Sequence, residues 1–344
     1  LDYIPAPHCI LKGVRKLPAG ALVRIDATRT DARSVPDVHR WWNAHARHEA
    51  AIDAGFEGDE DAALDALDTV LREAVALRME ADVPLGAFLS GGTDSSLVTA
   101  LMQVQSTRPV RSFSIGFDNA VHDESAHAAA VARHLRTDHT ELRADGRAAL
   151  DLVPGIARIY DEPFADSSQL PTALLCRLAR QHVTVALSGD GGDELFFGYG
   201  RYVRALRNDA RLERLPRRLL SRLAVDPGER ARLGGVAALR AELSTRNLQD
   251  VARHRISRWR RPEHVVRGAH PVVTAYDDPA ALLRNGTPAD QLMAMDFACY
   301  LPEDILTKVD RASMAVALEA RAPLLDWRVV ELAWSLPLSL KYRN

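Results

Sequence analysis

A glycine-rich run, Ser90-Gly91-Gly92-Thr93-Asp94-Ser95-Ser96, lies between an apolar stretch at 85–89 and a second apolar stretch at 97–102. This order predicts a tight turn between a strand and a helix. Glycines let the backbone approach an anion, hydroxyl groups add hydrogen-bond donors, and the helix offers the positive end of its dipole. The run is therefore expected to bind phosphate.

The aspartate of this run separates it from the phosphate loop of kinases and GTPases, because no Gly-x-x-x-x-Gly-Lys-Ser/Thr pattern occurs in the chain. Asp94 cannot hold a phosphate directly, but its carboxylate can hold the magnesium ion that neutralises a pyrophosphate. The run therefore predicts cleavage of ATP between its α and β phosphates. A purely structural Gly-Gly turn with a serine cap is the alternative, and the whole septet behind an apolar strand disfavours it.

A second glycine-rich run follows another apolar stretch, 183–187, and reads Ser188-Gly189-Asp190-Gly191-Gly192-Asp193-Glu194-Leu195-Phe196-Phe197-Gly198-Tyr199. Alone it could be a calcium-binding or simple turn segment, because Asp and Gly favour loops whatever the function. Strands separated by helical segments predict a parallel sheet that is covered on both faces and binds ligands at its carboxyl edge. Both runs are expected at that edge.

The two runs together carry a family resemblance. Residues 90–96 resemble the pyrophosphate loop of the ATP-pyrophosphatase superfamily, and residues 187–199 resemble the signature of glutamine-dependent asparagine synthetases. Further stretches match in the same order, at 3–7 with 16–20, at 161–168 and at 308–326. The resemblance covers nearly the whole chain. It implies an α/β fold: a parallel-sheet, Rossmann-like ATP-pyrophosphatase synthetase domain with a helical C-terminal part, preceded by the β-rich tail of an Ntn-type glutaminase domain.

The same resemblance implies a division of the chain. Residues 1–45 are expected to be the C-terminal remnant of the glutaminase domain, and residues 46–344 the synthetase domain. The chain begins at Leu1 rather than Met and stops where family members continue, so we expect it to be cut at both ends. The glutaminase nucleophile is the first residue of that domain, and Cys9 is not that cysteine.

The resemblance implies a reaction. Aspartate is expected to react with Mg-ATP to give a β-aspartyl-adenylate and pyrophosphate, and ammonia supplied from glutamine then gives asparagine and AMP. Relatives with the same core close β-lactam rings or amidate sugars and peptides, and the sequence leaves these acceptors open. A non-catalytic ATP-binding fragment and a tRNA-modifying enzyme are the rival classes. The second glycine run and the lack of a dedicated RNA domain argue against tRNA modification.

Site roles are carried over residue by residue. Asp190 is expected to be the catalytic residue that promotes formation of the intermediate and accepts the amine proton. Asp94 and Asp193 are expected to coordinate Mg²⁺. The positions expected to bind ATP are Leu89 and Ile115 beside the adenine, Ser188 and Gly189 at the nucleoside, and Ser90, Gly91, Gly92, Asp94, Ser95 and Ser96 at the pyrophosphate.

The chain departs from the family pattern at two places. Asp190 stands where the best-known asparagine synthetases carry glutamate, and the stretch 166–168 lacks the arginine that some members use to bind the substrate carboxylate. Near the C-terminus, Lys308 and Arg311 flank Asp310, and a structural ion pair and a substrate contact are equally open for them.

Composition sets further bounds. The chain has 344 residues and a formal net charge of −2, which does not point to a nucleic-acid or membrane partner. Its three cysteines are far apart and are expected to be buried thiols in a reducing compartment. We therefore expect a cytoplasmic enzyme with small-molecule substrates that forms a homodimer.

Hydrophobic patterns predict several further elements. An amphipathic helix is expected from residue 60, a strand over 113–117, and a helix over 123–135 with an acidic first turn. His122 and His127 in that region are five apart and do not share a helical face, so we interpret them as part of a helix start rather than a metal site. Residues 1–25 are expected to be rich in strands, and residues 200–290 to be wholly helical without a site.

Overall fold

A computed structural model describes most of the chain, namely residues 1–25, 37–117, 124–212, 247–257, 265–269, 273–274 and 276–343. The chain divides into two compact units. Unit 1 comprises residues 1–53 and 199–303, and unit 2 comprises residues 54–198 and 304–344. The expected evolutionary boundary at residue 45 stays a prediction.

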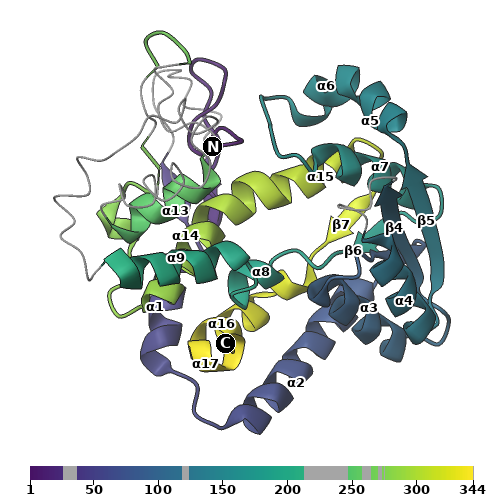
Figure 1. Cartoon of the computed structure of the whole chain (residues 1–344), viewed down its shortest axis with the longest axis horizontal. Coiled ribbons are helices and arrows are strands. Elements are labelled where there is room, and N and C mark those ends of the chain that lie inside the picture. Colours follow the sequence, from purple (N-terminus) through teal and green to yellow (C-terminus); the bar gives the residue numbers. More distant parts are fainter. Residues whose placement is uncertain are drawn as a thin grey trace. The chain divides into compact units, whose positions relative to one another are not determined.

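Unit 2 is built on a five-stranded parallel sheet, four strands of which are labelled in Figure 1. The strand order is β5-β4-β3-β6-β7. The strands are β3 (Leu85–Phe88), β4 (Arg111–Phe117), β5 (Asp138–Ala144), β6 (Val185–Leu187) and β7 (Glu319–Arg321). Three of them, β3, β4 and β6, are the strands expected from the apolar stretches. The predicted α/β fold with a parallel sheet is confirmed.

Helices cover both faces of this sheet. One core joins the sheet to α2 (Glu60–Met79), α3 (Thr93–Gln105) and α16 (Trp327–Ser335). The other joins it to α5 (Gly146–Leu152), α7 (Gln169–Arg180) and α15 (Leu306–Met314). Buried apolar side chains on both sides explain why β6 is a continuous apolar run rather than an alternating one.

The remaining elements of unit 2 are short or lie at its edge: α4 (Ser125–Leu135), η1 (Val153–Gly155), α6 (Ile156–Tyr160), α8 (Gly192–Leu195), η6 (Pro323–Leu325) and α17 (Leu338–Lys341). Helix α4 corrects one expectation. Its first turn contains no acidic residue, and Glu124 at the N-cap makes no side-chain cap. Asp123 and His122 lie outside the described residues.

The strand order places a topological switch point between β3 and β6. The chain runs outward from β3 through β4 to β5, and then returns to the other side of β3 to form β6. Connections that leave neighbouring parallel strands in opposite directions open a crevice outside the carboxyl ends of those strands. Both glycine-rich runs follow these two strands.

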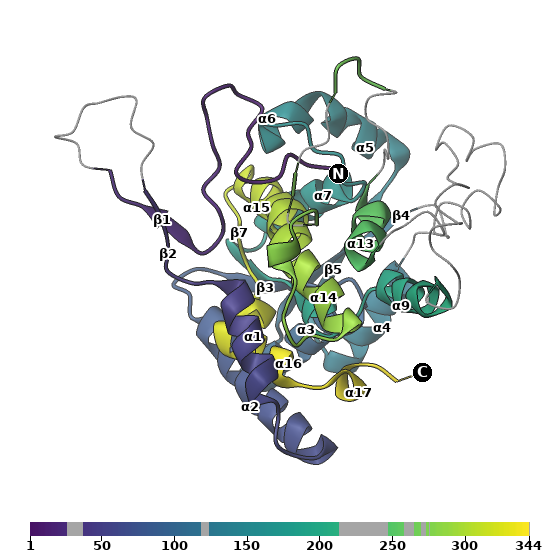
Figure 2. The same cartoon turned by 90° about the vertical axis from the view of Figure 1, so that its left-hand side faces the viewer.

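Unit 1 has little sheet. Strands β1 (Ala21–Val23) and β2 (Val38–Arg40) pair antiparallel and lead into α1 (Ala44–Ala54), as Figure 2 shows. The other elements are α9 (Gly200–Leu212), α13 (Leu248–Ile256), η4 (Pro279–Ala281), α14 (Pro288–Met295) and the π-helix η5 (Asp296–Ile305).

Two expectations for unit 1 were wrong. Within residues 1–25 only 21–23 form a strand, because the prolines and glycines of this segment support turns instead. The expectation of a wholly helical 200–290 also fails, since the described residues between 265 and 287 contain only the short helix η4.

A buried polar cluster organises the helices of unit 1. Asp296 accepts hydrogen bonds from Arg201 at 2.5 Å, from the Tyr202 hydroxyl at 2.7 Å and from the Tyr276 hydroxyl at 3.0 Å. The Arg201 guanidinium also lies 3.5 Å from the ring centre of Tyr199. A buried ion pair with all these bonds satisfied fixes how α9 and η5 meet.

Asp296→Asn is expected to lower the free energy of unfolding by about 3–5 kcal/mol, because it leaves the Arg201 charge buried without a counter-ion. Urea unfolding measures this loss. Asp250→Asn is the matched control, since Asp250 forms a half-exposed pair with Arg253 at 3.6 Å, and such pairs contribute less than about 1 kcal/mol. Equal effects of the two substitutions would contradict the role of the cluster.

Candidate active site

Both glycine-rich runs leave the same edge of the sheet, as expected. Strands β3 and β6 pair in parallel, with Ala87 opposite Leu187. The backbone N–H of Leu89 donates to the Phe113 carbonyl at 2.8 Å, and that of Ser188 donates to the Arg321 carbonyl at 2.8 Å. Both loops are therefore anchored to a neighbouring strand immediately before they leave the sheet.

The two loops touch through glycines of the second run. A Cβ at Gly189 would lie 2.7 Å from the backbone nitrogen of Ser95, and one at Gly192 would overlap the Asp94 carboxylate. Only glycine allows backbones to approach this closely. The second run therefore packs directly against the start of α3, and the carboxylate of Asp94 lies between the two loops.

Hydroxyl groups hold the first loop in a compact turn. The Oγ atoms of Ser90 and Ser95 lie 2.9 Å apart, and Ser90 Oγ also accepts from the Gly92 N–H at 3.3 Å. No side chain caps the N-terminus of α3, and uncapped N–H groups at the start of a helix favour an anion. Among the described residues, the buried Oγ of Ser96 has no hydrogen-bond partner, as expected of a group that a ligand or water completes.

Gly91 is required for two reasons. Its φ of +84° lies in the left-handed region, and a Cβ there would meet the backbone of His127 and Ala128 at the start of α4. The first turn of α4 therefore packs directly against the first glycine-rich loop and supports it. This contact gives His127 a structural place and agrees with its interpretation as part of a helix start.

Three carboxyl groups gather between the loops. Burial, together with the charges of Asp193 and Asp190, raises the pKa of Asp94 to about 6. Burial also raises the pKa of Asp190. A hydrogen bond from Ser188 and the charge of Lys308 lower it, but burial has the larger effect. Mutual repulsion of this kind is relieved when a cation binds.

These carboxylates fit a magnesium ion that arrives with pyrophosphate. Among the described residues no group of three or more His, Cys, Asp or Glu side chains forms a closed metal site. Mg²⁺ commonly takes one or two carboxylates and completes its octahedron with phosphate oxygens and water. Asp94 and Asp193 supply that number of ligands, and the repulsion that raises the pKa of Asp94 favours a cation.

The raised pKa of Asp94 predicts how stability depends on pH. A carboxyl whose folded pKa lies near 6, above its ordinary 3.8, stabilises the fold below about pH 4, and this contribution is lost as the pH rises through about 6. Asp94→Asn is therefore expected to gain stability relative to the wild type between about pH 4 and pH 7. Urea unfolding in EDTA measures the difference, and a difference that does not change with pH would contradict it.

The two residues expected beside the adenine lie in different parts of the core. Leu89 is buried with Ala128 and Ala132 of α4, whereas Ile115 is half-buried and packs with Phe113 on the face covered by α7. Leu89 follows β3 directly, and Ile115 lies two residues before the carboxyl end of β4. Their contact with adenine stays a prediction.

An ion pair at the start of α7 was not expected. Lys308 Nζ lies 3.0 Å from Asp166 Oδ2 and 2.8 Å from Ser168 Oγ. Burial raises the pKa of Asp166, but the Lys308 charge and the Ser168 hydrogen bonds outweigh it and lower that pKa to about 2. Lys308 therefore does not pair with Asp310, which instead lies 3.8 Å from the exposed Arg311. The motif stretches at 161–168 and 308–326 carried these residues, but nothing in them predicts the pairing.

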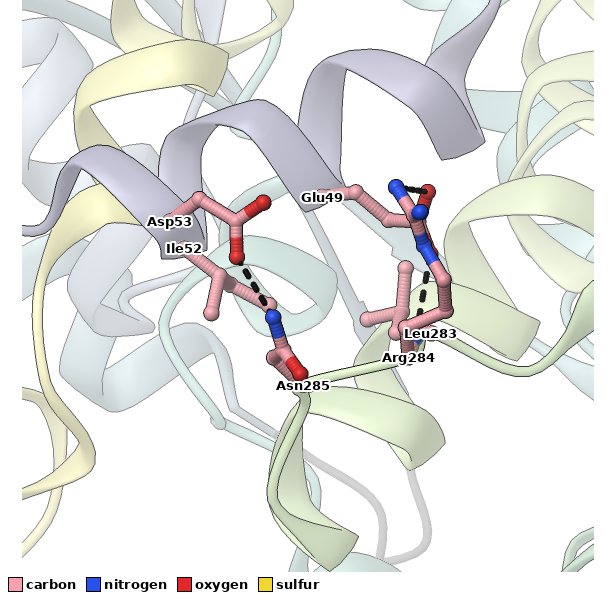
Figure 3. A pocket seen from close by; sticks show the side chains of 6 residues that line it. All are labelled: Glu49, Ile52, Asp53, Leu283, Arg284 and Asn285. Atoms are coloured by element: carbon pink, nitrogen blue, oxygen red, sulfur yellow. Dashed lines mark hydrogen bonds and ion pairs between the residues drawn. The ribbon is translucent and has the colours of Figure 1, made fainter.

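A shallow hollow in unit 1 is a weaker candidate. Its polar groups already bind each other: Glu49 accepts from Arg284, and Asp53 accepts from the Asn285 amide at 2.8 Å (Figure 3). These bonds fasten α1 to the segment 283–285. The hollow is therefore better explained as a structural contact between α1 and the segment 283–285 than as a ligand site.

The comparisons with known proteins agree with this geometry. The profile of the family described as "Asparagine synthase" matches residues 66–344. The chain belongs to the asparagine synthase family. The match includes both glycine-rich runs, the ion pair of α7 and α15, and every strand of the parallel sheet.

Curated relatives carry the family name. The chain is 32% identical over 346 residues to a protein of Mycobacterium tuberculosis named "Putative asparagine synthetase (glutamine-hydrolyzing)". The matched region covers 99% of this chain and 51% of that protein. It is 29% identical over 294 residues to asparagine synthetase 1 (glutamine-hydrolyzing) of Bacillus subtilis, covering 83% of this chain and 46% of that protein. The chain thus spans about half the length of these asparagine synthase relatives.

Two features of the described residues bear on location. None of the helices in this part of the chain combines the length and the hydropathy that a bilayer crossing requires. The three cysteines are free thiols, and Cys176 and Cys299 are buried as expected, whereas Cys9 is only half-buried. The cytoplasmic location and the homodimer expected for this asparagine synthase family member stay predictions.

Proposed function

We propose that this chain carries the ATP-dependent synthetase part of a glutamine-dependent asparagine synthetase and amidates the side-chain carboxylate of aspartate. The observation that carries the proposal is the meeting of the two glycine-rich loops at the switch point between β3 and β6, with Asp94 packed between Gly189 and Gly192. Family membership supports the reaction class.

ATP binds across the carboxyl ends of these strands. The uncapped start of α3 and the hydroxyls of Ser90, Ser95 and Ser96 hold the pyrophosphate. Ser188 and Gly189 contact the nucleoside, and Leu89 and Ile115 flank the adenine. Asp94 and Asp193 would hold a magnesium ion, which would neutralise charge on the pyrophosphate and make it a better leaving group.

The reaction then has two steps. An oxygen of the aspartate side-chain carboxylate attacks the α-phosphorus, the bond to the bridging oxygen breaks, and pyrophosphate leaves. Ammonia attacks the acyl carbon of the β-aspartyl-adenylate, and AMP leaves with the electron pair of the acyl–oxygen bond. The nitrogen loses a proton, and the carboxylate of Asp190 accepts it. Activation is needed because hydroxide is a far poorer leaving group than AMP.

Ammonia comes from glutamine in this proposal. The names of the relatives include "glutamine-hydrolyzing", and residues 1–45 correspond to the C-terminal tail of a glutaminase domain in the family. The synthetase reaction itself can be tested without that activity, since ammonium salts supply the same nucleophile.

The test of this function is product analysis. The natural full-length protein that contains this chain is incubated with Mg-ATP, ammonium and one candidate acid at a time, and mass spectrometry identifies the products. AMP with asparagine, formed only when aspartate is present, is the expected result. AMP with a different acid and its amide would keep the adenylating site and replace aspartate as the substrate. ATP binding without AMP release under any condition would contradict catalysis.

A further inference from the structure

We propose that Lys308 determines acceptor specificity by binding the α-carboxylate of the amino-acid substrate. This inference rests on the function proposed above and names the residue that recognises the substrate. Its basis is a buried ammonium group that has one unused N–H donor and whose charge acts on Asp190 of the second glycine-rich loop.

Lys308 is buried, with only 8% of its surface exposed. An ammonium group has three N–H donors, and two of them are used, by Asp166 and Ser168. No third partner occurs among the described residues. Buried lysines are rare unless their charge and donors are satisfied, so the third donor is placed for a group that is absent until substrate binds.

The local charges explain why a cation is needed. The charges of Asp190 and Asp193 in the second loop both act on Asp94 in the first. The charge of Lys308 acts on Asp190 and lowers its pKa. Aspartate brings two more carboxylates into this site. The magnesium ion serves the pyrophosphate, and Lys308 remains to attract the acid.

The fold places Lys308 on the side of the site where the amino-acid substrate binds in this proposal. Helix α15 packs on α7, and its Ala312 belongs to the core on that face of the sheet. The phosphate-binding start of α3 belongs to the opposite face. Asp190 follows the central strand β6 between the two faces and senses the Lys308 charge. A carboxylate on Lys308 is therefore positioned on the side of Asp190 away from the pyrophosphate loop.

Asp166 and Ser168 hold the lysine for this task. Asp166 Oδ1 accepts from both the backbone N–H and the hydroxyl of Ser168, each at 2.7 Å, so the loop ahead of α7 is closed on itself. Its other oxygen binds Lys308. These contacts fix the position of the Lys308 ammonium group, so its third N–H donor points in a single direction.

The experiment compares L-aspartate with its α-amide, L-isoasparagine, which keeps the reacting side-chain carboxylate and removes only the α-carboxylate charge. The wild type and Lys308→Met are assayed for substrate-dependent exchange of pyrophosphate into ATP and for AMP release with ammonium. The wild type is expected to prefer aspartate in kcat/KM by about 10- to 100-fold, the range for a hydrogen bond to a charged group. Lys308→Met is expected to lose that preference, mainly by a rise in the KM for aspartate.

Controls separate recognition from structure. Lys308→Arg, which keeps the charge, is expected to retain part of the preference. If Lys308→Met fails to fold, Asp166→Asn combined with Lys308→Met removes both charges of the pair and tests the same ratio. Equal losses for aspartate and the α-amide, with the preference unchanged, would overturn the proposal and leave Lys308 a structural residue.

The outcomes also separate this inference from the proposed function. If another α-amino acid replaces aspartate as substrate, the same comparison with the α-amide of that acid applies. If the acid that supports AMP release has no α-carboxylate, the role of Lys308 is overturned while adenylation stands. If no acid supports AMP release in the wild type, both proposals fall.

Discussion

Replacing Asp94 by asparagine is expected to reduce the release of pyrophosphate and AMP by at least about 1,000-fold. Asp94 lies between the two loops, and its carboxylate is one of two proposed ligands of the magnesium ion. Stabilisation of transferring phosphate charge by such an ion is worth several kcal/mol, and each 1.36 kcal/mol is a factor of ten in rate. The amide of asparagine keeps the shape but loses the charge.

The fold is expected to survive this change, because the raised pKa of Asp94 means that its charge does not stabilise the folded state at neutral pH. Circular dichroism and urea unfolding check this directly. Asp65→Asn on α2 is the matched control, since Asp65 is exposed and far from the two loops along the chain. Activity retained in Asp94→Asn would refute the magnesium assignment.

Replacing Asp190 by asparagine is expected to lower amide formation by about 10²- to 10⁴-fold, the usual contribution of a general acid–base group. Asp190 follows β6 within the second loop and receives a hydrogen bond from Ser188. An amide side chain can still accept hydrogen bonds but cannot take the amine proton at neutral pH. Steady-state rates of AMP and asparagine formation with ammonium measure the effect.

Asp190→Glu distinguishes the acid–base role from a packing role. The resemblance drawn from the sequence implies glutamate at this position in other family members, so this variant is expected to keep measurable activity despite the extra methylene. Asp161→Asn is the control for a carboxylate at the surface, because Asp161 is exposed and pairs with the exposed Arg311 at 3.5 Å. Equal activity in Asp190→Asn and the wild type would remove Asp190 from the mechanism.

Much of unit 2 can be predicted from the sequence, because its strands are short apolar runs bounded by turn residues. Strands β3, β4 and β6 lie where the apolar stretches at 85–89, 113–117 and 183–187 place them. Parallel strands end at one edge, so the meeting of the two glycine-rich loops also follows from the order of elements. The amphipathic helix from residue 60 is confirmed as α2.

Unit 1 could not be predicted in the same way. Its first 25 residues mix apolar residues with Pro and Gly, a pattern that strands and turns share, and only 21–23 pair with another strand. Residues 280–284 are all strong helix formers, yet Asp278 caps only one short 3-10 turn, and an extended residue follows at Leu282. Local propensity is a weak guide where tertiary contacts decide.

The sequence predicted which residues belong to the candidate site, but not which of their side chains pair with one another. The pairing of Lys308 with Asp166 joins positions 142 residues apart, and no periodicity links them. Sequence spacing instead suggested the neighbouring Asp310, whose side chain remains exposed. A buried partner of this kind is visible only when the packing of α15 on α7 is known.

The central claim is that a substrate carboxylate attacks the α-phosphorus of ATP, and isotope transfer tests it most directly. Aspartate with ¹⁸O in its side-chain carboxylate is converted with Mg-ATP and ammonium, and mass spectrometry follows the label. The account predicts one ¹⁸O atom in each AMP and none in pyrophosphate, because the carboxylate oxygen stays on the phosphorus when ammonia displaces AMP. Unlabelled AMP, or ¹⁸O in inorganic phosphate together with ADP, would contradict it.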